Sequence, residues 1–221
     1  MQVFVAGATG ETGRRIVQIL HDRQIPVRAL VRDRVLAQSL LPAEVEGVVG
    51  DVLDPAGLRS AMAGCTALII ATGARPSFDM MGPYKVDYAG TKNLVQAAQA
   101  TQIEHIVLVS SLCVSQFFHL LNLFWLVLFW KQQAEMVVKR SGIPYTIVRP
   151  GGLKNDPPSL PLVMAPADTL FEGSIARQQV VEVCVEALLH PQARHKVVEI
   201  VARAAAPVQA IADSFALIPS S

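Results

Sequence analysis

The sequence predicts an α/β fold with helices on both faces of a doubly wound parallel sheet, forming a single domain over residues 1–221. Three observations lead to this prediction. Short apolar, β-branched runs alternate with helical patterns, and such runs are typical of strands buried on both faces. Hydrophobic residues make up 52% of the chain and charged residues 17%, enough for a large core. A glycine-rich turn directly follows the first apolar run.

The predicted elements follow from these runs in chain order. The strands are 2–6 ("QVFVA"), 26–31 ("PVRALV"), 45–49 ("VEGVV"), 67–71 ("ALIIA"), 105–110 ("HIVLVS"), 145–149 ("YTIVR") and 197–201 ("VVEIV"). Helical patterns lie between most of them, most clearly at 11–23, 88–100 and 131–141. The proline-rich stretch 155–162 predicts a loop, so we interpret 150–175 as a loop-rich cap. It would cover the carboxyl edge of the sheet, where ligands bind in such folds.

The turn "GATGETG" places Gly7, Gly10 and Gly13 at intervals of three, between a strand and a helix. Gly7 would allow the tight turn, Gly10 would let the backbone approach a phosphate, and Gly13 would let the helix pack closely on the strand. The helix N-terminus would favour the anion. This context predicts a dinucleotide site; a tight turn without a ligand is the alternative.

The second strand ends in Arg32, 19 residues after Gly13. An acid at this place would bind the ribose 2′-hydroxyl of NAD, whereas an arginine suits the 2′-phosphate of NADP. Asp33 is the counter-argument, and we interpret it as the N-cap of the next helix. The sequence therefore predicts NADP(H) as the cofactor; a solvated charge at a strand end is the alternative for Arg32.

Composition excludes several other classes of protein. The net charge is +1 with no basic run, so we expect no nucleic-acid partner. The three scattered cysteines indicate reduced thiols rather than disulfides, and the spacing of the histidines predicts no metal site. Strand character from Gln2 leaves no room for a leader peptide, so we expect a cytoplasmic protein.

Four motifs in order, "GATGETG", "VRALVRD", "GDVLDP" and "YTIVRPGGL", resemble those of the atypical short-chain dehydrogenase/reductase superfamily. The resemblance is greatest to the NAD(P)H-binding branch of cyanobacterial and plastid type. That branch includes biliverdin reductase B, a flavin reductase, and the NADP-binding domain of a chloroplast import translocon subunit. The similarity covers residues 2–203 and implies a Rossmann fold.

The resemblance also implies roles for individual residues. Residues of the turn would wrap the pyrophosphate: Gly7, Ala8, Thr9, Gly10, Glu11, Thr12 and Gly13. Arg32 would take the 2′-phosphate, Asp51 and Val52 would flank the adenine, and Ala71, Thr72 and Gly73 would lie along the ribose. Beside the nicotinamide would stand Ser110 and Ser111, with Pro150, Gly151 and Gly152 closing the pocket. For Asp51, a loop or N-cap role is compatible with this.

The usual Tyr-x-x-x-Lys motif of the superfamily is incomplete here. Lys131 matches the lysine, but Val127 stands where the tyrosine would supply a proton. The biliverdin reductase B type also lacks this tyrosine, so its absence does not exclude a reductase. We take Ser111 and Lys131 as candidate catalytic residues; a strand-end hydroxyl and a surface lysine are the alternatives. Lys131 would also bind the cofactor ribose.

The segment 117–130, "FFHLLNLFWLVLFW", has no Asp, Glu, Lys or Arg. It is too short to cross a bilayer, which takes about 20 apolar residues. Three interpretations remain open: a lid on a flat substrate, a surface for a membrane or protein partner, and a homodimer seam.

Two functions are compatible with these observations. The first is an NADPH-dependent reductase that transfers hydride to a small planar substrate of the flavin, quinone or bilin class. The second is a non-catalytic NADP(H)-binding redox sensor or assembly factor at a membrane complex. The intact cofactor motifs favour the first, and the missing tyrosine favours the second.

Overall fold

The computed structural model describes residues 1–74, 79–123 and 125–220. It confirms the predicted α/β fold. Its main sheet has eight strands in the order β3-β2-β1-β4-β5-β6-β10-β8. The strands are β1 (Val3–Ala6), β2 (Val27–Val31), β3 (Glu46–Val49), β4 (Ala67–Ile70), β5 (His105–Val109), β6 (Tyr145–Pro150), β8 (Leu162–Pro166) and β10 (Lys196–Ala202). All seven strands expected from the sequence are present, within about a residue of the predicted bounds.

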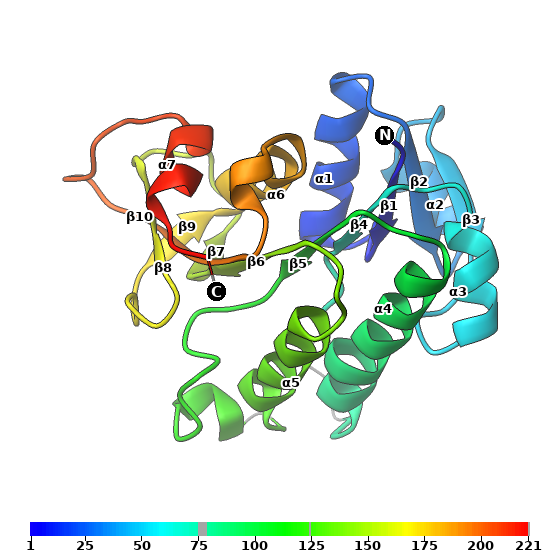
Figure 1. Cartoon of the computed structure of the whole chain (residues 1–221), viewed down its shortest axis with the longest axis horizontal. Coiled ribbons are helices and arrows are strands. Elements are labelled where there is room, and N and C mark those ends of the chain that lie inside the picture. Colours follow the sequence, from blue (N-terminus) through cyan, green and yellow to red (C-terminus); the bar gives the residue numbers. More distant parts are fainter. Residues whose placement is uncertain (75–78, 124, 221) are drawn as a thin grey trace.

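Helices cover both faces of this sheet (Figure 1). One layer contains α1 (Glu11–Asp22), α2 (Arg34–Leu40), α6 (Arg177–Leu189) and α7 (Ile211–Leu217); the other contains α3 (Pro55–Met62), α4 (Gly90–Ala100) and α5 (Val127–Lys139). Alternation along each strand builds the two cores. In β1, Val3 and Val5 face the first layer, and Phe4 and Ala6 the second. This burial on both faces explains why the strand sequences are apolar almost throughout.

Two features differ from a plain parallel sheet. β8 forms the edge of the sheet beyond β10 and pairs antiparallel with it, whereas β10 itself runs parallel to β6. Within the predicted cap 150–175, β7 (Gly152–Lys154) also pairs with β9 (Ser174–Ala176). In addition, a π-helical segment, η1 (Tyr84–Ala89), leads directly into α4. Such π segments are frequent at functional sites.

His105 is a buried histidine in β5, at the end of the sheet away from the glycine turn. Thr146 Oγ1 donates to the Ala193 carbonyl at 2.7 Å, so it must accept from His105 Nε2, which lies 3.0 Å away. Burial, with the nearby charges of Arg194 and His195, lowers the pKa of His105 to about 4. The neutral ring is therefore the form that the folded protein accommodates.

This burial makes folding stability pH-dependent. Between pH 6.5 and 4 the unfolded chain binds a proton at His105 that the folded chain does not, so stability falls as the pH drops through this window. From pH 7 to pH 5 the loss should be about 2 kcal/mol. Urea unfolding should show this loss in the wild-type protein and not in His105→Gln. The same change at the half-exposed His21 should leave it in place, and an identical pH profile for His105→Gln would contradict the assignment.

Candidate functional site

A cleft of about 400 Å³ opens at the carboxyl ends of β1 to β4. The sheet order reverses direction between β1 and β4, and ligands bind at this point in open α/β sheets. Nine of the residues expected to bind the cofactor line the cleft: Gly7, Thr9, Gly10, Arg32, Asp51, Val52, Ala71, Thr72 and Gly73. The structure therefore brings together segments that are far apart in the sequence.

The three positions of the turn require glycine for different structural reasons. Gly7 has φ +82°, and a Cβ there would lie 2.6 Å from the Ala71 carbonyl group. At Gly13 a Cβ would lie 2.1 Å from the Gly7 oxygen, so the helix can approach the turn only with glycine here. Gly10 is different: its nearest neighbour would be the same oxygen at 3.2 Å, and it lines the cleft. Two glycines thus shape the turn, and the third keeps open the space above it.

The other residues of the turn, Ala8, Glu11 and Thr12, contact the protein itself. Ala8 is fully buried, and Glu11 pairs with Arg14 and Arg15. Thr12 accepts a hydrogen bond of 2.8 Å from Arg177 Nη1. These residues support the turn from the helix side.

Arg32 is exposed at the end of β2 and lines the cleft. It makes no hydrogen bond or ion pair with any residue that the structure describes, so its guanidinium is available to a ligand. Asp33 is occupied elsewhere: its Oδ1 accepts from the amides of Val35 and Leu36 at 2.8 and 3.1 Å, as the N-cap of α2. The N-cap interpretation of Asp33 is confirmed.

Asp51 and Val52 form the wall of the cleft beyond β3. Asp51 Oδ1 accepts from the Leu53 amide at 2.8 Å, which holds the turn, while Asp54 is the N-cap of α3. Val52 packs so closely on Gly90 that a Cβ at Gly90 would lie 2.8 Å from it. An apolar wall beside a carboxylate suits an adenine ring and its amino group.

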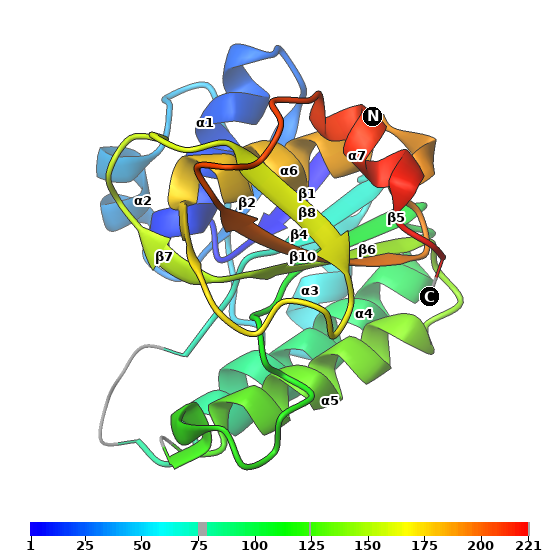
Figure 2. The ribbon, with the colours of Figure 1, turned by 90° about the vertical axis from the view of Figure 1, so that its left-hand side faces the viewer.

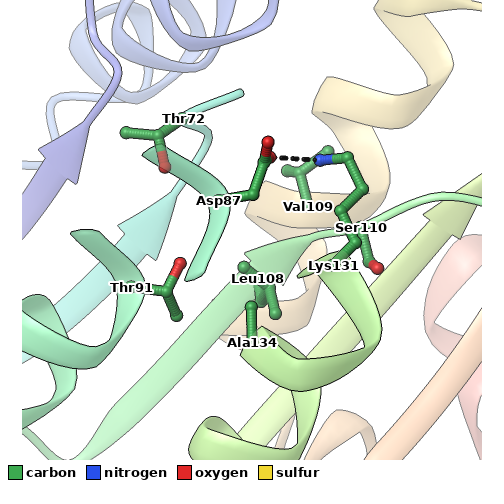
Figure 3. Close-up of a pocket in the computed structure, with 8 residues that line it drawn as sticks. All are labelled: Thr72, Asp87, Thr91, Leu108, Val109, Ser110, Lys131 and Ala134. Carbon is green, nitrogen blue, oxygen red and sulfur yellow. Dashed lines mark hydrogen bonds and ion pairs between the residues drawn. The ribbon is translucent and has the colours of Figure 1, made fainter. Parts of the chain in front are cut away.

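A second, much smaller cavity of about 10 Å³ lies beyond Thr72, between β5 and α5 (Figure 3). Ser110 and Lys131 line it, as do two residues that the sequence analysis missed, Asp87 and Thr91. Lys131 Nζ donates to Asp87 Oδ1 at 2.8 Å. Asp87, almost fully buried in η1, also accepts from the Ala74 amide at 3.3 Å. Asp87 thus links Lys131 to the loop that follows β4.

Ser110 is buried and donates to Glu135 Oε1 at 2.6 Å. A serine hydroxyl has one hydrogen, so Ser110 can only accept from a further partner. Ser111 lies half-buried in the loop after β5, one residue beyond. Val127, in the place of the missing tyrosine, is the first residue of α5 and packs against the apolar cluster around Leu112.

Pro150, Gly151 and Gly152 lie where β6 ends and β7 begins. A Cβ at Gly151 would lie 2.6 Å from the Gly173 oxygen, and the Gly152 amide donates to this oxygen at 2.9 Å. The two glycines therefore let β7 approach the loop before β9. Their expected contact with a nicotinamide stays a prediction.

The donors and the space of the site fit a nicotinamide dinucleotide. An unpaired guanidinium stands at one end of the cleft, and glycine backbone lines its middle. At the other end the Thr72 hydroxyl oxygen is buried with no hydrogen-bond partner among the described residues. An orphaned buried hydroxyl costs about 1–3 kcal/mol, and a ligand hydroxyl there would relieve this cost.

The apolar segment 117–130 is exposed in its first part. Phe118 is 99% exposed and Leu123 is 74% exposed, and Phe117, Leu120, Leu121, Trp125 and Leu126 are also exposed. Phe124 lies outside the described residues. In Figure 2 the segment is at the lower left, far from α7 at the upper right. Among the described residues no helix is both long and apolar enough to cross a membrane.

Comparison with known proteins places the chain in a family. Residues 7–191 match the family model of NAD(P)H-binding proteins. The chain belongs to this family. It is an atypical short-chain dehydrogenase/reductase with close chloroplast relatives, and NAD(P)H is its cofactor.

Several relatives match over most of this NAD(P)H-binding protein. An uncharacterized chloroplast protein of Arabidopsis thaliana, At2g34460, is 49% identical over 98% of this chain and 82% of its own length. Sanguinarine reductase of Eschscholzia californica is 34% identical over 89% of this chain and 87% of its own. The chloroplast protein TIC 62 of Pisum sativum is 36% identical over 99% of this chain, but this chain spans 46% of TIC 62.

The fold has counterparts among solved structures. A Bacillus halodurans protein described as an NAD-dependent epimerase/dehydratase superposes with a TM-score of 0.86, at 25% identity, over 98% of this chain and 99% of its own.

Proposed function

We propose that the protein is an NADPH-dependent reductase of a flat conjugated substrate. The observation that carries the proposal is the continuity of the site. The cleft runs from the unpaired Arg32 to Thr72, and Thr72 also lines the small cavity with the Lys131–Asp87 pair. NADPH bound along this path would supply a hydride at the Lys131 end.

The side chains at that end would bind and orient rather than react covalently. The Lys131 ammonium uses one hydrogen on Asp87, and its other two can donate to ribose hydroxyls or to negative charge that develops on a substrate. Ser111 is an auxiliary candidate at the same strand end. With Val127 in the tyrosine position, water is left as the ultimate proton source.

The substrate class is supported by the surroundings of Lys131. Trp130 contacts Tyr84 and Tyr88, with ring centroids 4.9 and 5.7 Å apart. These half-buried rings offer flat apolar surface beside the pair. Sanguinarine reductase, by its name, also reduces a small organic molecule, which favours an enzyme over a purely structural protein.

Steady-state NADPH oxidation with a panel of flavins, quinones and bilins tests this proposal. We expect turnover with at least one class, and at a higher rate with NADPH than with NADH. NADPH binding without oxidation across the whole panel would contradict the reductase and favour the sensor or assembly factor.

Lys131→Ala should weaken NADPH binding or slow hydride transfer by about tenfold, because it removes a charged donor and leaves the Asp87 carboxylate buried and unpaired. Stopped-flow absorbance at 340 nm and a binding titration separate the two effects. The exposed Lys92 on α4 provides the control, since Lys92→Ala should change neither NADPH binding nor hydride transfer.

Ser111→Ala should lower turnover only modestly, and complete loss of activity would show that the serine is more than an auxiliary.

The second candidate function is a non-catalytic NADP(H)-binding protein that docks on a membrane complex. The exposed apolar side chains of Phe117, Phe118, Leu120, Leu121, Leu123, Trp125 and Leu126 favour it, because monomeric soluble proteins rarely expose a large apolar patch. The relative TIC 62 is a chloroplast protein, and this chain matches less than half of it. A cytoplasmic location, membrane association and a homodimer all stay proposals.

The double variant Leu123→Ser/Phe118→Ser should weaken the binding of whatever partner covers this patch. Leu217, on α7, is as exposed as Leu123, so Leu217→Ser is a matched control. Loss of liposome co-sedimentation would indicate a membrane surface, a lower mass by light scattering a dimer, and loss of turnover at unchanged NADPH affinity a lid. If the double variant and the control agree in all three assays, the patch has none of these roles.

A further inference from the structure

A row of polar side chains crosses the second face of the sheet at its carboxyl edge. Ser110 directly follows β5 and Arg149 is the last but one residue of β6. Glu199 lies in the middle of the neighbouring strand β10, where the register places it opposite Arg149. Strand alternation puts them on the side of Leu108, Ile147 and Val197, which pack under α3, α4 and α5. Glu135 of α5 meets them from above, one turn after Lys131.

Arg149 is the centre of this group, which we call the Arg149 network. Its Nε and Nη2 donate to the two oxygens of Glu135 at 2.9 and 2.7 Å. Its Nη1 donates to Asp168 and Glu199 at 2.8 and 3.2 Å. Glu199 also accepts from the backbone amides of residues 168–170, and Glu135 from Ser110.

The network carries more negative than positive charge. Three carboxylates, from Glu135, Glu199 and Asp168, surround one guanidinium, which leaves two negative charges in excess. Burial alone would lower the pKa of Arg149, but its three acidic partners raise it above the ordinary value. Burial likewise opposes ionisation of Asp168, yet Ser115, Arg149 and the exposed Lys139 keep its pKa below the usual value.

Two observations place this charge at the nicotinamide end of the site. Ser110, bonded to Glu135, lines the small cavity together with Lys131. The unpartnered Thr72 oxygen is buried in the wall of the same cavity, which indicates that a ligand group approaches there. The Lys131–Asp87 pair is balanced in charge, so the excess comes from the Arg149 network.

We propose that the Arg149 network makes the protein bind oxidised NADP⁺ more tightly than NADPH, with Glu135 as the main contributor. This rests on the proposed function, because it requires the nicotinamide beside Ser110. The oxidised ring carries a positive charge that the reduced ring lacks, so buried negative charge stabilises only the oxidised form. The cofactor would thereby be a stronger hydride donor on the protein than in water.

The effect is measurable without a substrate. We expect Glu135→Gln to weaken NADP⁺ and to leave NADPH nearly unchanged, which shifts the ratio of their dissociation constants about tenfold. Tenfold corresponds to about 30 mV in the potential of the bound two-electron couple. Titration calorimetry of both forms gives the ratio directly. Glu186→Gln is the control: Glu186 also pairs with an arginine, Arg23, but lies on α6, across the sheet.

A second variant guards against a folding defect in Glu135→Gln. The Asp168 side chain is 52% exposed, so Asp168→Asn should fold normally and shift the ratio in the same direction by a smaller factor. Unchanged ratios in both variants, or equal weakening of both cofactor forms, would overturn the proposal. The proposed function is tested separately with 2′-phospho-ADP-ribose, which lacks the nicotinamide. If the wild-type protein bound this compound as tightly as NADPH, the site would not recognise the nicotinamide, and the proposed function itself would fail.

Discussion

Gly10→Val should reduce NAD(P)H affinity at least a hundredfold while the protein remains folded. Gly10 lines the cleft, and its backbone is extended, with φ −79° and ψ 166°, a conformation that valine also adopts. The new Cβ would lie 3.2 Å from the Gly7 oxygen, a contact that a small shift relieves. The rest of the side chain would occupy the space above the turn, where the pyrophosphate must approach the helix N-terminus.

Two other glycines provide controls for this prediction. Gly47→Val adds the same side chain in β3, where the nearest atom would be 4.0 Å away, so binding should be unchanged. Gly13→Val should lower the melting temperature, because its Cβ would lie 2.1 Å from the Gly7 oxygen. Calorimetry with NADPH and thermal unfolding of the three variants check the set. Unaltered affinity in Gly10→Val would show that the turn has no ligand above it.

The strands and the cofactor cleft could be predicted because their signals are local. A buried parallel strand is apolar over its whole length, and a glycine turn between strand and helix is contiguous in the sequence. The N-cap role of Asp33 could be predicted in the same way, since an N-cap has a fixed offset from the helix it starts. The binding of a 2′-phosphate by Arg32 stays a prediction. The antiparallel β8 was not predicted, because its half-buried sequence begins at the end of the proline-rich stretch 155–162, which favours a loop, and lies within the cap predicted over 150–175.

Local sequence signals do not reveal the charged pairs at the carboxyl edge of the sheet. Asp87 meets Lys131 across 44 positions of sequence, and Arg149 meets Glu199 across 50. No spacing rule joins residues so far apart; the pairing arises only once neighbouring strands and the helix above them are in place. A charged residue at the end of a predicted apolar strand, such as Arg149 in "YTIVR", was the available signal that something must neutralise it.

Arg32→Ala should distinguish NADPH from NADH. A charge-assisted hydrogen bond contributes about 1.5–3 kcal/mol, so NADPH should bind roughly ten- to a hundredfold more weakly. NADH lacks the 2′-phosphate and should be nearly unaffected. The exposed side chain of Arg32 has no ion-pair partner among the described residues, so its removal should leave the fold unchanged.

Arg34→Ala is the matched control, because Arg34 is also exposed but lies at the start of α2, outside the lining of the cleft. This variant tests whether any positive charge near the adenosine end of the cleft is enough to favour NADPH over NADH. We expect Arg34→Ala to weaken both cofactors by less than about twofold, as is usual for a solvent-screened charge. Titrations of both variants with both cofactors complete the comparison. Equal weakening of NADPH and NADH by Arg32→Ala, or an equal effect of the two arginines on NADPH, would mean that another group recognises the 2′-phosphate.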